Sequence, residues 1–307
     1  MSNASSRRTF LQQATAATLL GGALAGNVTA QDKPLDMVIA RWTGSKDAWE
    51  ELAVKMTEQA IENLGGMKRF ISKGDVVWVK PNIGWDRTPE QAANTNPDVV
   101  KTLVRMSIEA GAKTVKVGDY TCNPAEKSYA NSKIADAAKA VGGEVVFLDK
   151  NRFRDMEING ENLKTHPVYP EVVECDLVIN VPIVKHHTLA TITCCMKNYM
   201  GVIENRQRFH QDLPTCITDL AAFMKPRLCV LDALRILTAN GPTGGDLKDV
   251  KHTYTLAAGT DIVALDALGA ELLGHNPADI GTVAAGEKRG LGVMNYKSLA
   301  LKELEVA

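Results

Sequence analysis

The sequence predicts an α/β fold in which a mainly parallel sheet is flanked by helices, in one lobe or two. Short apolar runs of strand length alternate with segments of helical spacing, which is typical of right-handed crossovers between parallel strands. Glycines follow the helical segments, where a helix ends readily. The run 75–80 (DVVWVK) is almost wholly apolar, as expected for a strand buried on both faces.

The expected elements follow one another along the chain. Asn96 can cap a helix that Pro97 opens. Gly142-Gly143 can end the helix expected over 128–141. The polar segment 150–173 is expected to be a hairpin or a bridge between two lobes. The expected strands are 35–40, 75–80, 114–117, 144–148, 176–181, 227–231 and 253–258. The expected helices are 48–64, 97–110, 128–141, 213–224 and 261–273, with one more after Asn276-Pro277.

The first thirty residues have the features of an export signal. Arg7-Arg8 precede a modestly apolar run to Ala25, and Val28-Thr29-Ala30 is a small-residue cleavage pattern. We therefore expect a twin-arginine signal peptide in 1–30, a mature domain in 31–307, the twin-arginine export machinery as a partner, and a periplasmic or otherwise exported location. No other stretch reaches about 18 apolar residues, so we expect no stable membrane span after cleavage.

The composition is that of an ordinary globular protein. The 307 residues are 45% hydrophobic and 23% charged, with a formal net charge of −1. A nucleic-acid or anionic-membrane partner usually requires a basic surplus, so both are set aside.

The segment 182–210 concentrates the groups that can carry chemistry. Lys185, His186 and His187 follow the expected strand 176–181 and a proline, so we expect them on a loop at the carboxyl edge of the sheet, where ligands bind. Histidine can serve as acid, base or metal ligand, and a neighbouring lysine disfavours its protonated form. Surface or capping residues are the alternative interpretation of the pair.

Lys197 and Asn198 come next, after the adjacent cysteines Cys194 and Cys195. A lysine with an amide can bind a phosphate or a carboxylate. The cysteines are interpreted as buried, inert thiols, with a thiolate nucleophile or metal ligand as the alternative.

Further cations and a third histidine extend the candidate site. Arg206 and His210 follow in the same segment, and Lys80 and Asn82 stand at the end of the expected strand 75–80. Together with Lys185 and Lys197, they make a pocket for an anionic small molecule. A solvated surface is the alternative for the charges after residue 203.

Acidic groups also stand at expected strand ends. Asp119 and Asp232 could bind a divalent cation, with His187 as a further candidate ligand, or orient a histidine. Helix capping explains such aspartates equally well. The cysteines contain no C-x-x-C pair, and the loop 240–245 (NGPTGG) lacks the pattern of a nucleotide-binding loop.

An ordered set of short motifs resembles the domain of unknown function 362 family over about residues 75–292. The motifs are Val79-Lys80-Pro81-Asn82, the helix after Asn96-Pro97, Lys185-His186, Lys197-Asn198-Tyr199-Met200-Gly201, Phe209-His210, Asn240-Gly241-Pro242 through Gly244, and Asp261 to Ala267.

The resemblance implies an α/β domain without implying one reaction. Members are often associated with iron–sulfur chemistry through an attached ferredoxin-like cysteine cluster, which this sequence lacks, so an iron–sulfur cluster is not expected in this chain. The residues that the resemblance carries over are Lys80, Asn82, Lys185, His186, Lys197, Asn198, His210 and Asp266.

Our leading hypothesis is an exported enzyme that acts on an anionic small molecule. Its catalytic residues are expected to be His186, Lys197 and His210. Its substrate-binding residues are expected to be Lys80, Asn82, Lys185, Asn198 and Arg206. Two alternatives stay open: a metal- or cofactor-binding module that holds a divalent metal, with His187, Asp119 and Asp232 as candidate ligands, and a partner of an exported redox complex.

Overall fold

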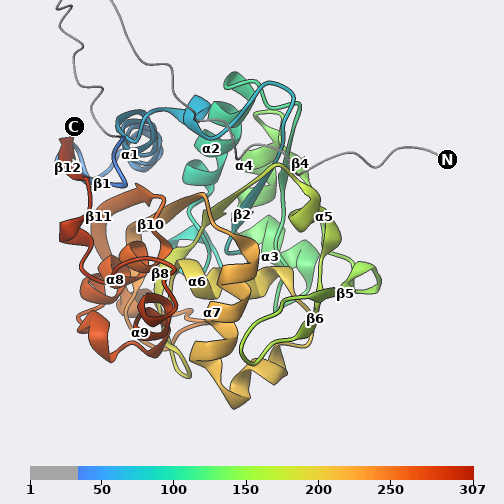
Figure 1. The fold of residues 1–307 in the computed structure, drawn as a ribbon. Coiled ribbons are helices and arrows are strands. Elements are labelled where there is room, and N and C mark those ends of the chain that lie inside the picture. The colour runs from blue at the N-terminus through green and yellow to red at the C-terminus, as the bar shows by residue number, and fades with distance from the viewer. Residues whose placement is uncertain (1–33) are drawn as a thin grey trace, which may run out of the picture. The chain divides into compact units, whose positions relative to one another are not determined.

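A ten-stranded sheet runs through the centre of the protein (Figure 1). The structure, a computed structural model, describes residues 34–307. The strand order is β12 (Leu301–Val306), β1 (Met37–Trp42), β11 (Val250–Gly259), β10 (Leu228–Leu237), β7 (Leu177–Val181), β2 (Val76–Pro81), β3 (Thr114–Val117) and β4 (Glu144–Val145). Two further strands, β8 (Ile183–His187) and β9 (Thr191–Thr193), extend it from β10.

Most neighbouring strands are parallel, which confirms the predicted fold class. Strand β2 pairs in parallel with β3 on one side and β7 on the other, and β10 pairs in parallel with β7 and β8. The antiparallel pairs are β1 with β11, β10 with β11, and β8 with β9.

Helices cover both faces of the sheet (Figure 1). One group consists of α1 (Trp49–Asn63), α2 (Pro97–Glu109), α3 (Ala125–Asn131) and α4 (Ile134–Lys139). The other consists of α6 (Cys195–Asn198), α7 (Leu213–Met224), α8 (Ile262–Leu272) and α9 (Gly281–Lys288). The sheet separates two hydrophobic cores, one beneath each group.

The alternation of side chains along each strand feeds these two cores. In β2, Val77 and Val79 pack with the first group of helices, whereas Trp78 packs in the core of the second group. In β10, Val230 likewise packs with the first group of helices, and Leu231 packs in the core of the second group. This double burial explains why the strands are apolar throughout.

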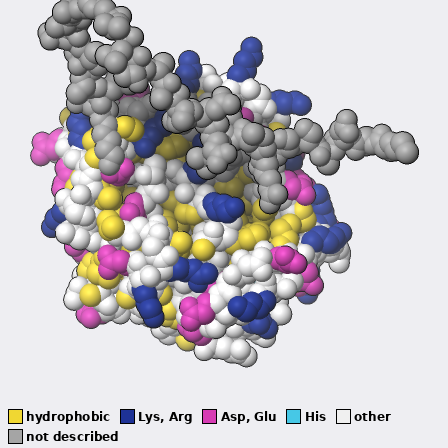
Figure 2. All heavy atoms as spheres, in the orientation of Figure 1, with side chains coloured by type: hydrophobic (Ala, Val, Ile, Leu, Met, Phe, Trp, Pro, Cys, Tyr) yellow, Lys and Arg dark blue, Asp and Glu magenta, His cyan; other side chains and the backbone are white. Residues whose placement is uncertain are grey.

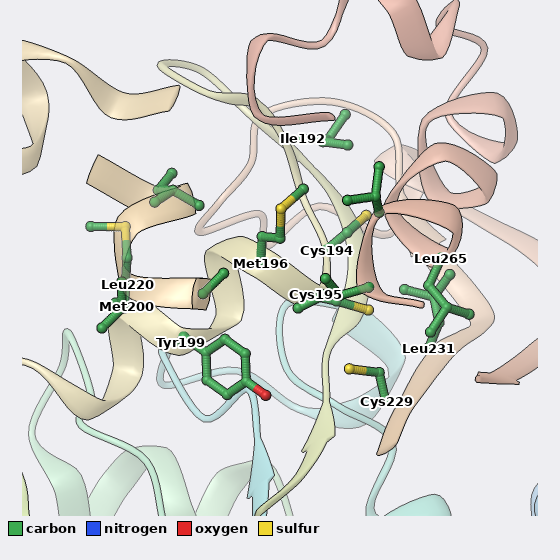
Figure 3. Packing of buried hydrophobic residues seen from close by; sticks show 14 of the residues in the cluster. Ile192, Cys194, Cys195, Met196, Tyr199, Met200, Leu220, Cys229, Leu231 and Leu265 are labelled. Carbon is green, nitrogen blue, oxygen red and sulfur yellow. The ribbon is translucent and has the colours of Figure 1, made fainter. Parts of the chain in front are cut away.

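The cysteines of the second core pack as buried side chains. Figure 3 shows Cys194, Cys195 and Cys229 among Tyr199 and Leu231. All six cysteines of the chain are free in the structure, and burial raises the pKa of the Cys194 and Cys195 thiols well above its usual value. A thiol held protonated in this way is a poor nucleophile.

Several expected boundaries differ from the structure. The helix expected over 128–141 is two helices, α3 and α4, separated at Lys133, which has a left-handed backbone with φ of 63°. The strand expected over 144–148 shortens to β4. Strand β12 was not expected, because its sequence Leu301–Val306 (LKELEV) is largely polar and exposed at the edge of the sheet.

The segment 150–173 contains a hairpin and a short helix. Its strands β5 (Arg154–Glu157) and β6 (Thr165–Val168) pair in antiparallel fashion, and α5 (Pro170–Glu174) leads into β7. Residues 34–307 form one compact unit. The expected signal peptide in 1–30 lies outside the described residues.

The order of the strands reverses beside β2. The chain passes outward from β2 to β3 and β4, and then returns to β7 on the opposite side of β2. Lys80 of β2 lies opposite Asn180 of β7 in the register. In open α/β sheets, ligands bind at the carboxyl ends of strands where the order reverses in this way.

Candidate functional site

A cavity of about 350 Å³ opens at the carboxyl ends of β2 and β3. Seven of the eight residues predicted to be catalytic or substrate-binding line it: Lys80, Asn82, Lys185, Lys197, Asn198, Arg206 and His210. Two of the candidate metal ligands, His187 and Asp119, line it as well. His186 and Asp232 are not among its lining residues.

The alternation of strand β8 decides which of its residues reach the cavity. The loop expected at 185–187 is a strand, paired with β10 on one side and β9 on the other. Lys185 and His187 are two positions apart and both line the cavity. His186 lies between them, and its Nδ1 accepts a hydrogen bond from the Gly241 amide at 3.1 Å. The structure thus places the His186 ring against the loop 240–245.

A buried ion pair forms one wall of the cavity. Nζ of Lys80 lies 2.7 Å from Oδ1 of Asp119 and also donates to the Pro81 carbonyl and to Oδ1 of Asn198. The second oxygen of Asp119 accepts the Ile83 amide at 2.7 Å. All three Nζ donors of Lys80 are therefore engaged within the protein.

Asn198 connects this ion pair to the neighbouring strand. Its Oδ1 accepts from Lys80 at 3.0 Å and from Nδ2 of Asn82 at 3.1 Å. Its Nδ2 donates to Oδ1 of Asn180 and to the Lys80 carbonyl. These four hydrogen bonds use the full capacity of a side-chain amide, so Asn198 positions its neighbours.

Lys185 and Lys197 have no carboxylate partner among residues 34–307. Nζ of Lys185 donates to Oδ1 of Asn82 at 3.0 Å and to the Ala93 carbonyl at 2.6 Å. Burial lowers the pKa of Lys185 to about 7. Burial, followed by the positive charge of Arg206, lowers the pKa of Lys197 to about 8. Both amines can change protonation state near neutral pH.

Arg206 is held by backbone carbonyls and faces a cysteine. Its guanidinium donates to the carbonyls of Met200 and Tyr120 and to Sγ of Cys122, the last at 3.1 Å. The guanidinium also stacks over the Tyr120 ring. The sequence analysis missed Cys122 and Tyr120, although both follow strand β3 closely, where a strand-end argument would have found them.

His187 lines the cavity, and the backbone holds one of its ring nitrogens. Its Nδ1 accepts hydrogen bonds from the backbone amides of Leu189 and Ala190, at 3.1 and 3.2 Å. Burial, aided by the charges of Lys197 and Lys185, lowers the pKa of His187 to about 3. The ring is therefore neutral, and its proton is on Nε2. His210, by contrast, is exposed and lies at the edge of the cavity.

The two remaining acidic candidates hold backbone amides. Asp232 accepts from the amides of Asn96 and Leu234, and burial raises its pKa to about 6. Asp266 accepts from the amides of Cys195 and Met196 and so fixes the start of α6, with its pKa raised by burial to about 7.

The donor groups do not combine into a metal site within the part of the chain that the structure describes. No group of three or more His, Cys, Asp and Glu side chains there is placed to hold a metal ion. An iron–sulfur cluster fits no better, because Cys122 faces the cavity alone while Cys194, Cys195 and Cys229 pack in the core.

A family model of a domain of unknown function, DUF362, matches residues 77–271. The chain belongs to this family. A thylakoid-associated protein of Synechocystis sp. is 30% identical to this DUF362 protein over 241 residues, which are 75% of this chain and 73% of that one. All the residues that line the cavity lie within the matched range.

A crystal structure of a Thermotoga maritima protein is a more distant match. It is 11% identical, with a TM-score of 0.39, and the match covers 67% of this chain and 54% of that one. Separately, none of the helices within residues 34–307 combines the length and apolar character needed to cross a membrane.

Gly201 packs directly against the ion pair between Lys80 and Asp119. A Cβ there would overlap Oδ1 of Asp119 and would come within 2.5 Å of Nζ of Lys80. We expect Gly201→Ala to lower the free energy of unfolding by about 1–3 kcal/mol, the usual effect of overpacking. Denaturant unfolding measures this change.

Gly84→Ala is the matched control, because Gly84 also lines the cavity and a Cβ there would only approach Oδ1 of Asn82, at 3.6 Å. We expect its effect to be about 0.5 kcal/mol or less. Equal destabilisation by the two substitutions would contradict the importance of the ion pair.

Proposed function

We propose that this DUF362 protein is an enzyme whose cavity binds an anionic small molecule. One observation carries the proposal: four cationic side chains, Lys80, Lys185, Lys197 and Arg206, line the cavity against a single carboxylate, Asp119. Because Asp119 is already paired with Lys80, the other three cations have no carboxylate partner within residues 34–307. An anionic ligand supplies the missing charge and relieves the repulsion between them.

The hydrogen-bond inventory supports a division of roles. Arg206 and Lys185 keep unused donors and Lys197 donates to no oxygen, so these three contact the anion. Lys80 and Asn198 have no donor left and instead hold the wall of the cavity. Asn82 connects the two groups of residues, because its Oδ1 accepts from Lys185 and its Nδ2 donates to Asn198.

Proton transfer is proposed for the two lysines with lowered pKa values. Lys185 and Lys197 titrate near neutral pH, the range in which an acid or base is most effective. Neutral His187 offers its Nε2–H as a hydrogen-bond donor to a developing negative charge. The exposed His210 stays a candidate for proton transfer, and His186 acts by positioning the loop 240–245.

Anion binding can be measured with simple probes. We expect phosphate, sulfate and succinate to raise the melting temperature, and Lys197→Met or Arg206→Met to weaken succinate binding about tenfold or more, because hydrogen bonds to charged groups contribute about 1.5–3 kcal/mol. Calorimetric titration gives the dissociation constants. Lys139→Met, which removes an exposed lysine of α4, is expected to change binding less than about twofold.

A protein that none of the three anions stabilises would contradict the proposal. So would equal losses of affinity in Lys197→Met and Lys139→Met.

Binding should also take up protons. An anion favours the charged forms of Lys185 and Lys197, which are partly neutral at about pH 8. We expect about one proton to be taken up per succinate at about pH 8, little uptake at about pH 6, and weaker binding as the pH rises through about 7–9. Calorimetry in buffers of different ionisation enthalpy measures the uptake, and succinate itself does not titrate across the upper part of this range. Uptake that is independent of pH would contradict these assignments.

Export is proposed from the N-terminal pattern alone. Replacing Arg7 and Arg8 by Lys is expected to retain the protein in the cytoplasm, because the twin-arginine route reads the pair. Cell fractionation with detection of both precursor and mature chain measures this. An unchanged distribution of the variant would rule out that route.

A further inference from the structure

The three lysines of the cavity differ in how many oxygen atoms their Nζ groups reach. Lys80 reaches three, including a carboxylate. Lys185 reaches two, the Asn82 amide oxygen and the Ala93 carbonyl. Lys197 reaches none within residues 34–307, and its hydrogen-bond contact is Sδ of Met200 at 3.5 Å. A thioether sulfur is a weak acceptor, so the Lys197 amine is the least satisfied of the three.

The surroundings of Lys197 favour its neutral form. Its side chain is partly buried, and Arg206 lies close enough for its charge to oppose that of the ammonium group. A pKa of about 8 leaves roughly a tenth of the Lys197 amine free at pH 7 and about half free at pH 8. A lysine that is desolvated beside another cation is the usual form of an amine nucleophile that attacks carbonyl groups.

The rest of the cavity fits a substrate that has both a carbonyl group and a carboxylate. Arg206 retains free guanidinium N–H groups, which suit a carboxylate. His187 offers Nε2–H to a carbonyl oxygen. Trp85, Leu189 and Pro242 add apolar surface to the lining, which suits an apolar substituent on the substrate.

We propose that Lys197 forms a Schiff base with the carbonyl carbon of a 2-oxo acid that carries an apolar side chain. This inference rests on the proposed anion-binding function and names its substrate class. Lys197 is then the covalent nucleophile, and Arg206 orients the substrate through its carboxylate.

The step balances with groups that line the cavity. The lone pair of Nζ of Lys197 attacks the carbonyl carbon, and the C=O π electrons move to oxygen. A proton then passes from the attacking nitrogen to this oxygen to give a neutral carbinolamine. The carbinolamine C–O bond then breaks, and the hydroxyl leaves as water with a proton from Lys185, whose ammonium form the bound carboxylate favours. A protonated imine forms. One carbonyl, one amine and one proton give one iminium and one water.

Borohydride trapping tests the proposal on the mature protein. The protein is incubated with phenylpyruvate, pyruvate or acetone at about pH 8, sodium cyanoborohydride reduces any imine to a stable secondary amine, and peptide mass spectrometry locates it. We expect modification at Lys197 to exceed that at exposed lysines by roughly tenfold or more, because exposed amines with a pKa near 10.4 are almost fully protonated. We expect phenylpyruvate to give more adduct than pyruvate, and acetone to give little.

Two variants serve as controls. Lys197→Gln is expected to abolish the adduct at this site, whereas Lys139→Gln, at an exposed position of α4, is expected to leave it unchanged. Mapping of the wild-type protein decides the question even if Lys197→Gln does not fold.

The outcomes separate this inference from the function on which it rests. Three outcomes would overturn the assignment of Lys197. The adduct could be spread evenly over surface lysines, it could be located at Lys185 instead, or its amount could be equal for acetone and the oxo acids. If succinate binds and no oxo acid is trapped, the Schiff base is wrong and anion binding stands. If succinate also fails to bind, both are wrong.

Discussion

The buried ion pair between Lys80 and Asp119 is the interaction on which the site depends. Removing two charges from water is costly unless the remaining donors and acceptors are also satisfied. Here, the Pro81 carbonyl, the Ile83 amide and Asn198 complete the pair. Because these partners come from β2, the end of β3 and α6, the electrostatic requirement of one lysine fixes three elements around the cavity.

The charge that remains in the cavity follows from this arrangement. Asp119 neutralises Lys80, and Lys185 and Lys197 then face a cavity whose other lining residues supply cationic or neutral groups. The backbone amides of Leu189 and Ala190 keep Nδ1 of His187 unprotonated, so this ring adds no charge. On the face shown in Figure 2, Lys and Arg are interspersed with Asp and Glu around an apolar centre. The part of this face that the described residues form therefore carries no broad basic surface.

The family match covers only part of the sheet. Residues 77–271 run from β2 to α8 and contain every residue that lines the cavity. Strands β1 and β12 lie outside this range and pair with each other in parallel at the far edge of the sheet. The matched region is therefore the part that forms the cavity, and the flanking strands complete the sheet.

The sequence by itself determined the fold class, most element positions and the charged and histidine residues of the cavity lining, because apolar runs and polar strand ends are local features. It placed Lys80, Asn82 and Asp119 correctly at the ends of β2 and β3. Only the tertiary structure decided that 185–187 is a strand whose alternation turns His186 away from the cavity. It also decided which lysines are satisfied, since the partner of Lys80 in α6, Asn198, is 118 residues distant along the chain. Hydrogen bonds between such distant residues depend on the packing of whole elements, which no local pattern encodes.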